Sequence, residues 1–169
     1  GWFGDKYPRK NDSSSLGDWV VDKNKLPNGI EGLLSDAKKH GVKFGIWIEP
    51  EMANTTSELY EKHPDWVLKA SERDVVLGRG GTQVVLDLAN PAVQDFVFGV
   101  VDNLMTSYPE IDYIKWDANM SVQNHGSQYL TKDNQSHMYI EFHRGFEKIC
   151  QRIRAKYPDL TIQACASGG

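Results

Sequence analysis

The segment of this chain with the clearest chemical potential is Tyr113-Ile-Lys-Trp-Asp-Ala-Asn119, in which a carboxylate stands between a lysine and an amide. The apolar run at its start is typical of a buried strand, and alternate residues of a strand point to the same face. Lys115, Asp117 and Asn119 are therefore expected to share one face at the end of this strand. A lysine two residues from a carboxylate favours its ionised form, which suits a nucleophile better than a general acid.

A purely structural explanation fits the same residues. An aspartate at a strand end is also a common helix N-cap, and a neighbouring lysine can simply form a salt bridge. The catalytic interpretation gains support because other strands of the chain also end in polar groups. Glu49 and Glu51 come directly after the predicted strand Val42–Ile48, and Cys165 ends the last predicted strand.

The elements that must position these residues alternate between strand and helix. Strands are predicted at Val42–Ile48, Val84–Leu88, from Ile111 towards Asp117, and at Leu160–Cys165; helices with an apolar stripe are predicted from Ile30 to Ala37, after Asn90-Pro91, and from Tyr139 to Ile153. This alternation, without hairpin signals, predicts a parallel sheet with right-handed crossovers. Such a sheet binds its ligand at the carboxyl ends of the strands. No Gly-rich phosphate loop opens a helix, so we expect an α/β fold of the (β/α)8 TIM-barrel class rather than a doubly wound sheet.

The length of the chain bears on its domain organisation. A (β/α)8 barrel needs about 250 residues, whereas this chain has 169, begins without Met and stops directly after a strand. We therefore expect residues 1–169 to form a partial catalytic barrel domain, truncated at both ends, with about four to five β/α units.

The composition is that of an ordinary globular segment, with 40% apolar residues, 25% charged residues and a net charge of −4. The sequence has no basic stripe for nucleic acid and no run of about 18 apolar residues for a membrane span, so neither partner is expected. Both cysteines are interpreted as thiols, and the histidines show no zinc-ligand spacing, so no metal or other cofactor is expected. Localisation stays open, with a preference for the cytoplasm.

Five tryptophans are many for a chain of this length. Trp2, Trp47 and Trp116 fall at or near strand ends, where an aromatic face suits a sugar ring. Trp19 and Trp66 lie in loop-like segments and are expected to fill the core.

Eight motifs of the chain occur in an order that resembles one known family. They are Gly1-Trp-Phe-Gly, Ser15-Leu-Gly-Asp-Trp19, Leu26-Pro-Asn-Gly29, Gly45-Ile-Trp-Ile-Glu-Pro-Glu-Met52, His63-Pro-Asp-Trp66, Val85-Leu-Asp-Leu88, Tyr113-Ile-Lys-Trp-Asp-Ala-Asn119 and Cys165-Ala-Ser-Gly-Gly169. Together they resemble the catalytic domain of bacterial α-galactosidases of glycoside hydrolase family 36, over nearly the whole chain.

This resemblance implies a (β/α)8 barrel that releases terminal α-linked galactose from oligosaccharides, with retention of configuration and through a covalent glycosyl-enzyme. Asp117 matches the family's nucleophile. The positions that match substrate-binding residues are Trp47, Arg79, Lys115, Asn119 and Cys165. The family's acid/base aspartate lies one strand beyond the motif that starts at Cys165, outside this chain, so the isolated chain is expected to be inactive. The resemblance is also compatible with a homo-oligomeric full-length protein.

Other functions also fit the residues. A magnesium-dependent barrel could use Glu49 or Glu51, Asp87 and Asp117 as oxygen ligands. A non-catalytic galactoside-binding or decayed protein would keep the pocket without the acid. Within the family, transfer of galactose to another sugar is a further alternative. If no magnesium is bound, Glu49 and Glu51 are interpreted either as structural residues that brace the barrel mouth or as residues that support the substrate contacts from behind.

Overall fold

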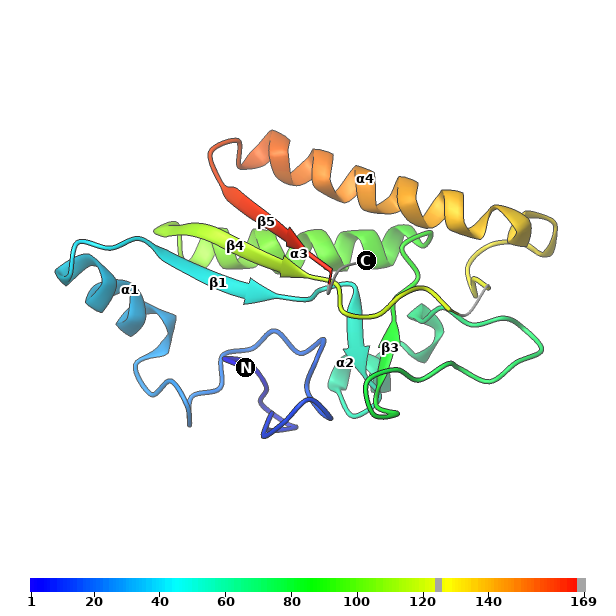
Figure 1. Cartoon of the computed structure of the whole chain (residues 1–169), viewed down its shortest axis with the longest axis horizontal. Helices are drawn as coiled ribbons and strands as arrows, with labels where there is room; N and C mark the ends of the chain where they lie inside the picture. The colour runs from blue at the N-terminus through cyan, green and yellow to red at the C-terminus, as the bar shows by residue number, and fades with distance from the viewer. Residues whose placement is uncertain (124–125, 167–169) are drawn as a thin grey trace.

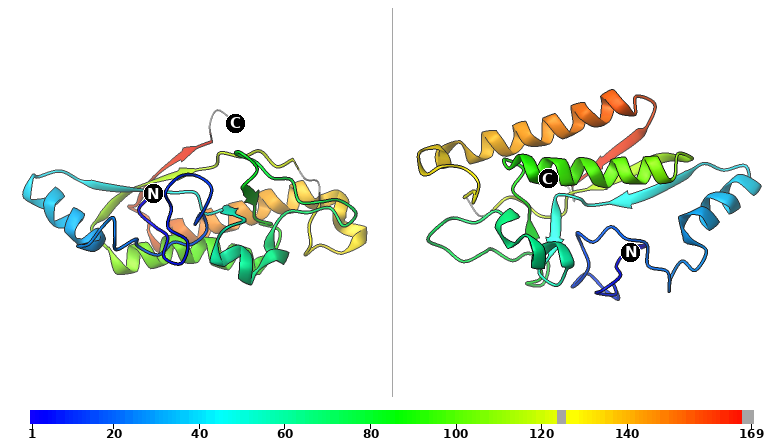
Figure 2. Two further views of the ribbon diagram at one scale, coloured as in Figure 1. Left: turned by 90° about the horizontal axis from the view of Figure 1, so that it is seen from below. Right: turned by 180° about the vertical axis from the view of Figure 1, so that it is seen from behind.

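A computed structural model describes residues 1–123 and 126–166 of the chain. Its elements, in order, are α1 (Gly29–Lys39), β1 (Phe44–Ile48), β2 (Met52–Asn54), α2 (Glu58–Lys62), the 3-10 helix η1 (Pro64–Trp66), β3 (Gln83–Val85), α3 (Pro91–Ser107), β4 (Ile111–Asp117), the 3-10 helix η2 (Lys132–His137), α4 (Met138–Lys156) and β5 (Thr161–Cys165). Strands β1, β4 and β5 form a parallel sheet in the order β1-β4-β5. Helices α3 and α4 run along one face of this sheet (Figure 1), and the turned views place both on the same side (Figure 2).

The long helices follow from local signals that the sequence carries. Asn90 caps α3 by accepting a hydrogen bond from the backbone N of Ala92 at 2.9 Å, and Pro91 occupies the first turn, where its missing N–H costs nothing. The predicted apolar stripe of α3 is buried at Val93, Val97, Val100 and Leu104, whereas its fifth member, Phe96, is only partly buried. In the described part of the chain, no helix has the length and apolarity needed to cross a membrane.

The register of the sheet divides the side chains of β1 and β4 between two faces. Ile46 pairs with Ile114 and Ile48 with Trp116, and all four belong to the core packed around α3 and α4. Because neighbouring residues of a strand point to opposite faces, Lys115 and Asp117 point away from these helices.

One predicted strand lies outside the parallel sheet. Gln83–Val85 pairs antiparallel with β2, and β1 pairs directly with β4. The prediction that Val84–Leu88 joins the parallel sheet is therefore wrong. Its backbone groups bond elsewhere, since Leu86 N donates to Glu51 O and Asp87 N donates to Trp66 O. The long connection from β2 to β3 contains α2 and η1, so no tight-turn signal announces the pairing.

Helix α4 passes so close to the segment after β3 that it needs glycine at position 145. A Cβ on Gly145 would lie 1.9 Å from the backbone O of Leu88, whereas a Cβ on Gly99 in α3 would meet nothing within 4 Å. We expect Gly145→Ala to destabilise the full-length protein by about 1–3 kcal/mol through overpacking. Gly99→Ala is expected to stabilise it by up to about 1 kcal/mol, the usual gain for alanine in a helix. Thermal unfolding of both variants measures the difference, and equal stability of the two would contradict this packing.

Candidate active site

The carboxyl ends of the three parallel strands bring four of the predicted site residues together. The register places Trp47 beside Lys115, and Asp117 beside Cys165. A hydrogen bond of 2.7 Å from Ala118 N to Cys165 O continues the pairing of β4 with β5 past the end of β4. The four side chains therefore belong to two neighbouring pairs of residues at the carboxyl end of the sheet.

Asp117 combines burial with a polar surrounding. It is 8% exposed, and its Oδ2 accepts a hydrogen bond from Nε1 of Trp47 at 3.0 Å. Burial by itself raises the pKa of Asp117, but the side chains of Asn119, Trp47 and Cys165 and the charge of Lys115 outweigh burial and lower the pKa below its ordinary value. The other oxygen, Oδ1, has no hydrogen-bond partner within residues 1–123 and 126–166. Asp117 is thus a carboxylate whose lowered pKa favours the ionised form, with Oδ2 held by Trp47 and Oδ1 buried without a hydrogen-bond partner in the described part of the chain.

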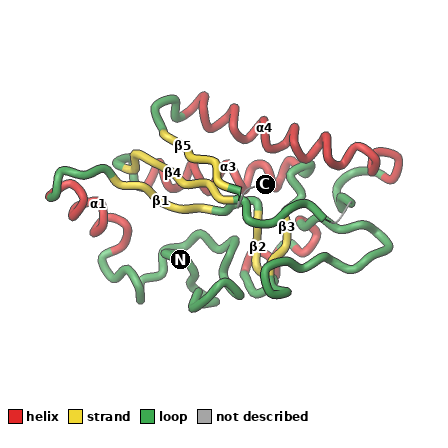
Figure 3. The backbone as a smooth tube through the Cα atoms, viewed as in Figure 1, coloured by secondary structure: helices red, strands yellow, loops and turns green. Residues whose placement is uncertain are grey.

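The N-terminal segment holds Trp47 in place. Figure 3 shows the chain before α1 as loop, beside the end of β1. Nε1 of Trp2 donates to the backbone O of Trp47 at 2.8 Å. The Phe3 ring lies nearly parallel to that of Trp47 at 6.2 Å, and the Trp19 ring is also 6.2 Å away. Trp19 and Trp66 pack against the core, as predicted. This aromatic cluster keeps the indole N–H of Trp47 directed at Asp117.

Trp116 lies on the other side of the sheet. It is 5% exposed, its ring packs edge-on against Phe146 of α4 at 5.7 Å, and its Nε1 donates to Oε2 of Glu51 at 2.7 Å. The expectation that Trp116 offers a face to a sugar is therefore wrong, because strand alternation turns it away from Asp117.

Two further carboxylates are buried next to this site. Oε1 of Glu49 accepts a hydrogen bond from the backbone N of Asn119 at 2.7 Å, and burial raises the pKa of Glu49. Burial also raises the pKa of Glu51 to about 8. A carboxyl group with such a pKa is mostly protonated at neutral pH.

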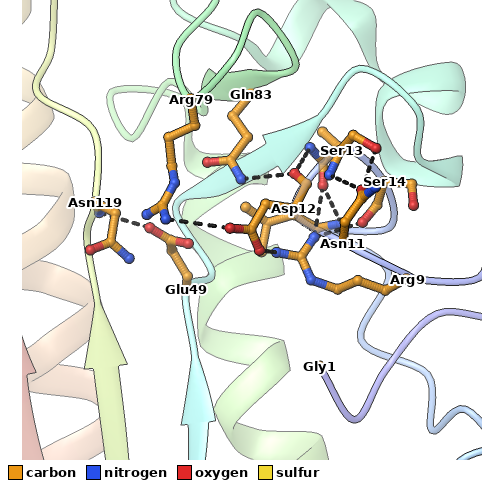
Figure 4. A network of polar contacts seen from close by, with 12 residues as sticks. Gly1, Arg9, Asn11, Asp12, Ser13, Ser14, Glu49, Arg79, Gln83 and Asn119 are labelled. Atoms are coloured by element: carbon orange, nitrogen blue, oxygen red, sulfur yellow. Dashed lines mark hydrogen bonds and ion pairs between the residues drawn. The ribbon is translucent and has the colours of Figure 1, made fainter.

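Arg79 reaches the same edge from the loop before β3. Figure 4 shows its guanidinium extended towards Glu49, whose pKa its charge helps to lower against the effect of burial. Nη2 of Arg79 pairs with Oδ2 of Asp12 at 3.4 Å, and Oδ1 of Asp12 pairs with Nη2 of the buried Arg9 at 3.0 Å. Sequence reasoning assigned no role to Arg9 or Asp12. No local motif could have identified them, because only the fold brings them to Arg79.

Asp87, one of the oxygen ligands in the magnesium alternative, is occupied by hydrogen bonds within the protein. Asp87 accepts hydrogen bonds from the hydroxyl of Ser127 and, at 3.1 Å, from the backbone N of Ala89. Across the described residues, no group of three or more His, Cys, Asp or Glu side chains could hold a metal ion. In the motif that starts at Cys165, residues 167–169 lie outside the described residues.

A hollow of about 880 Å³ lies between the N-terminal segment, α2 and α3. Trp2 and Trp19 line it, but none of the six predicted site residues does. The candidate site is therefore the sheet edge around Asp117 and not this hollow.

Comparison with known proteins identifies a family model and several relatives that match this chain. The model of the Melibiase family matches residues 1–169. The chain is 38% identical to α-galactosidase AgaA of Geobacillus stearothermophilus and 40% identical to α-galactosidase 2 of Pediococcus pentosaceus, in each case over 169 residues that make up all of this chain and 22% and 23% of those proteins. The chain thus spans about a fifth of the length of these relatives.

The solved structures that superpose on this chain are also those of α-galactosidases. The α-galactosidase of Lactobacillus brevis superposes with a TM-score of 0.91 at 40% identity, over 99% of this chain and 22% of that one. A variant of AgaA in complex with raffinose superposes with a TM-score of 0.91 at 38% identity, over 100% of this chain and 23% of that one. With these neighbours, the parallel sheet and its covering helices are part of a (β/α)8 barrel.

Proposed function

Because this chain belongs to the Melibiase family, we propose that the full-length protein is a retaining α-galactosidase, with residues 1–169 as part of its catalytic barrel domain. Its substrates are oligosaccharides that end in α-linked galactose. Support for this substrate class comes from AgaA variants, whose structures hold raffinose and stachyose.

The state of Asp117 is the observation that carries the proposal. The buried carboxylate has a lowered pKa, Oδ2 is held by Trp47, and Oδ1 has no hydrogen-bond partner within the described residues. The carboxylate of Asp117 attacks the anomeric carbon of galactose, and a C–O bond forms while the bond to the leaving oxygen breaks. Water then attacks the same carbon and releases Asp117, so two inversions retain the configuration.

The leaving oxygen needs a proton from a second carboxyl group. Glu49 and Glu51 are buried near Asp117 but are bonded to Asn119 and Trp116, which suits a structural role better than proton transfer to a substrate. We assign the acid/base to a part of the full-length protein outside this chain. The same carboxyl group then deprotonates the attacking water.

The galactose contacts come from the residues around Asp117. Lys115 and Asn119 lie two positions before and after it and suit hydrogen bonds to galactose hydroxyls. The indole of Trp47 walls the sugar, the thiol of Cys165 lies near the 2-hydroxyl, and Arg79 contacts the substrate from the loop before β3. These five assignments rest on the resemblance of the motifs together with the placement of the side chains.

The stereochemical course of the reaction tests the proposal. With an aryl α-galactoside and the full-length protein, proton NMR is expected to detect α-galactose before mutarotation produces the β-anomer. Initial release of β-galactose would contradict the covalent intermediate. Calorimetric binding of galactose without any turnover would favour a non-catalytic binding protein, and activity lost to a chelator and restored by magnesium would favour the metal-dependent alternative.

A further inference from the structure

The backbone pairing of β1 with β4 stops just before Asp117. The last paired residues are Ile48 and Trp116, one position short of the carboxylate. On the opposite side, β5 continues to pair with β4 at Asp117 itself. The β1 side of the segment that carries Asp117 is therefore held by other groups.

Two glutamates that follow β1 bind the segment around Asp117 in place of backbone pairing. Glu49 accepts the backbone N–H of Asn119, two residues after Asp117, and Glu51 accepts the indole N–H of Trp116, the residue before it, each at 2.7 Å. Glu49 is 2% exposed and Glu51 is 7% exposed. The two hydrogen bonds therefore hold the segment at a residue before and a residue after Asp117 in the sequence.

We propose that Glu49 and Glu51 are positioning residues, which hold the Asp117 carboxylate in line for attack through the backbone of Asn119 and the ring of Trp116. The inference rests on the proposed function, since it concerns the same nucleophile. Misplacement of a reacting group by about 1 Å costs on the order of a hundredfold in rate. The loss of either short hydrogen bond beside the nucleophile is therefore expected to lower kcat strongly.

The energetics of burial also favour positioning over simple bracing. Burying a carboxyl group costs free energy, and apolar residues of similar volume often stabilise a protein as well or better. A brace that served stability alone could be made of apolar side chains. Methionine at these positions leaves the N–H of Asn119 or Trp116 without its acceptor, which costs about 1–3 kcal/mol. The melting temperature of each variant therefore separates a loss of positioning from a loss of structure.

Glu51 sits among other titratable groups. Glu49 and Asp117 face it from the ends of β1 and β4, and the thiol of Cys150 faces it from α4. A protonated Glu51 still accepts the indole N–H of Trp116 through its carbonyl oxygen. Ionisation adds a negative charge beside Asp117 and Glu49, which disturbs the site electrostatically.

Matched substitutions in the full-length protein test the proposal. Glu49→Met and Glu51→Met remove the acceptor oxygen, whereas Glu49→Gln and Glu51→Gln keep it. We expect each Met variant to lower kcat for an aryl α-galactoside by about 10–100-fold, and each Gln variant by about threefold or less at pH 6. The inhibition constant of galactose is expected to change by less than about threefold, because ground-state binding is not affected. The control is Glu110→Met, an exposed glutamate at the opposite end of β4.

The pH profile provides a readout that bracing alone would not change. With the pKa of Glu51 at about 8, kcat of the wild-type protein is expected to fall above that pH, and Glu51→Gln is expected to extend activity to higher pH. The free energy of unfolding is expected to depend on the ionisation of Glu51 as well. The contribution of Glu51 is complete below its ordinary pKa of 4.5 and is lost as the pH rises to about 8, because the folded state binds the proton more tightly. Glu51→Gln is expected to remove this decline in melting temperature.

The outcomes separate this inference from the proposed function. Met variants with wild-type kcat would overturn the positioning role and leave the α-galactosidase proposal standing. Gln variants as slow as the Met variants would also overturn it, because the acceptor oxygen would then be irrelevant. A parallel collapse of melting temperature, galactose binding and kcat in the Met variants would reduce the glutamates to structural residues. A wild-type protein without turnover would overturn the proposed function, and the inference with it.

Discussion

Replacement of Asp117 by asparagine is expected to lower kcat of the full-length protein by about 10⁴-fold or more, because the amide cannot form the glycosyl ester. The side chain keeps its shape, and its carbonyl oxygen can still accept the N–H of Trp47. The fold and the galactose site should therefore survive. Initial rates with an aryl α-galactoside measure the loss, and galactose binding by calorimetry checks that the site remains.

Asp112→Asn is the matched control for this prediction. Asp112 lies on the same strand near its opposite end, where it pairs with the exposed Lys43 at 3.6 Å. An exposed pair of this kind contributes about 0–1 kcal/mol, so this variant should keep its activity. Mass spectrometry after trapping with a fluorinated galactosyl fluoride should place the label on the peptide that contains Asp117. A label on another carboxylate, or an Asp117→Asn protein with substantial activity, would refute the assignment.

Trp47→Phe is expected to lower kcat/KM by about 10–100-fold and to move the acidic limb of its pH profile to higher pH. Phenylalanine keeps an aromatic wall but removes the N–H that binds Oδ2 of Asp117 at 3.0 Å. A carboxylate that loses a hydrogen bond to its ionised form has a higher pKa. Since Asp117 acts in the ionised form, protonation would then stop the reaction at a higher pH than in the wild-type protein.

Trp19→Phe makes the same change of ring in the same aromatic cluster. Nε1 of Trp19 has no hydrogen-bond partner in the part of the chain that the structure describes, so its loss should leave the acidic limb in place. An acidic limb that moves equally in both variants would attribute the effect to packing. An unmoved limb in Trp47→Phe would mean that the bond to Asp117 has no influence on the nucleophile.

Local patterns were sufficient for much of the architecture. Asn90 and Pro91 predicted the start of α3, and the apolar steps along α3 and α4 predicted most of the faces that these helices bury. Tyr139, at the start of the predicted stripe of α4, is exposed. The alternation from Lys115 to Asp117 predicted that both side chains share one face of their strand, and both residues lie within β4. Signals of this kind succeed because capping and strand alternation depend on residues only a few positions apart.

Local patterns failed where the structure depends on contacts between residues far apart in the sequence. Val84–Leu88 has the composition of a core strand, but its antiparallel partner β2 is separated from it by α2 and η1, and no turn links them. Trp116 looked like a sugar-facing aromatic because it adjoins Asp117, although adjacency along a strand means the opposite face. The chain of ion pairs from Arg9 through Asp12 to Arg79 likewise joins residues that no motif connects.

The sequence by itself therefore determined the fold class, the family resemblance and the carboxylate at the end of β4, since these depend on residue types and short spacings. Only the tertiary structure decided the state of that carboxylate. Trp47 reaches it from a strand 70 positions away in sequence, and burial raises the pKa of Glu49 and Glu51 while polar contacts lower that of Asp117. Burial and hydrogen bonding are properties of the folded surroundings, so three carboxyl groups that are chemically alike in the sequence acquire pKa shifts of opposite direction only when the strands meet.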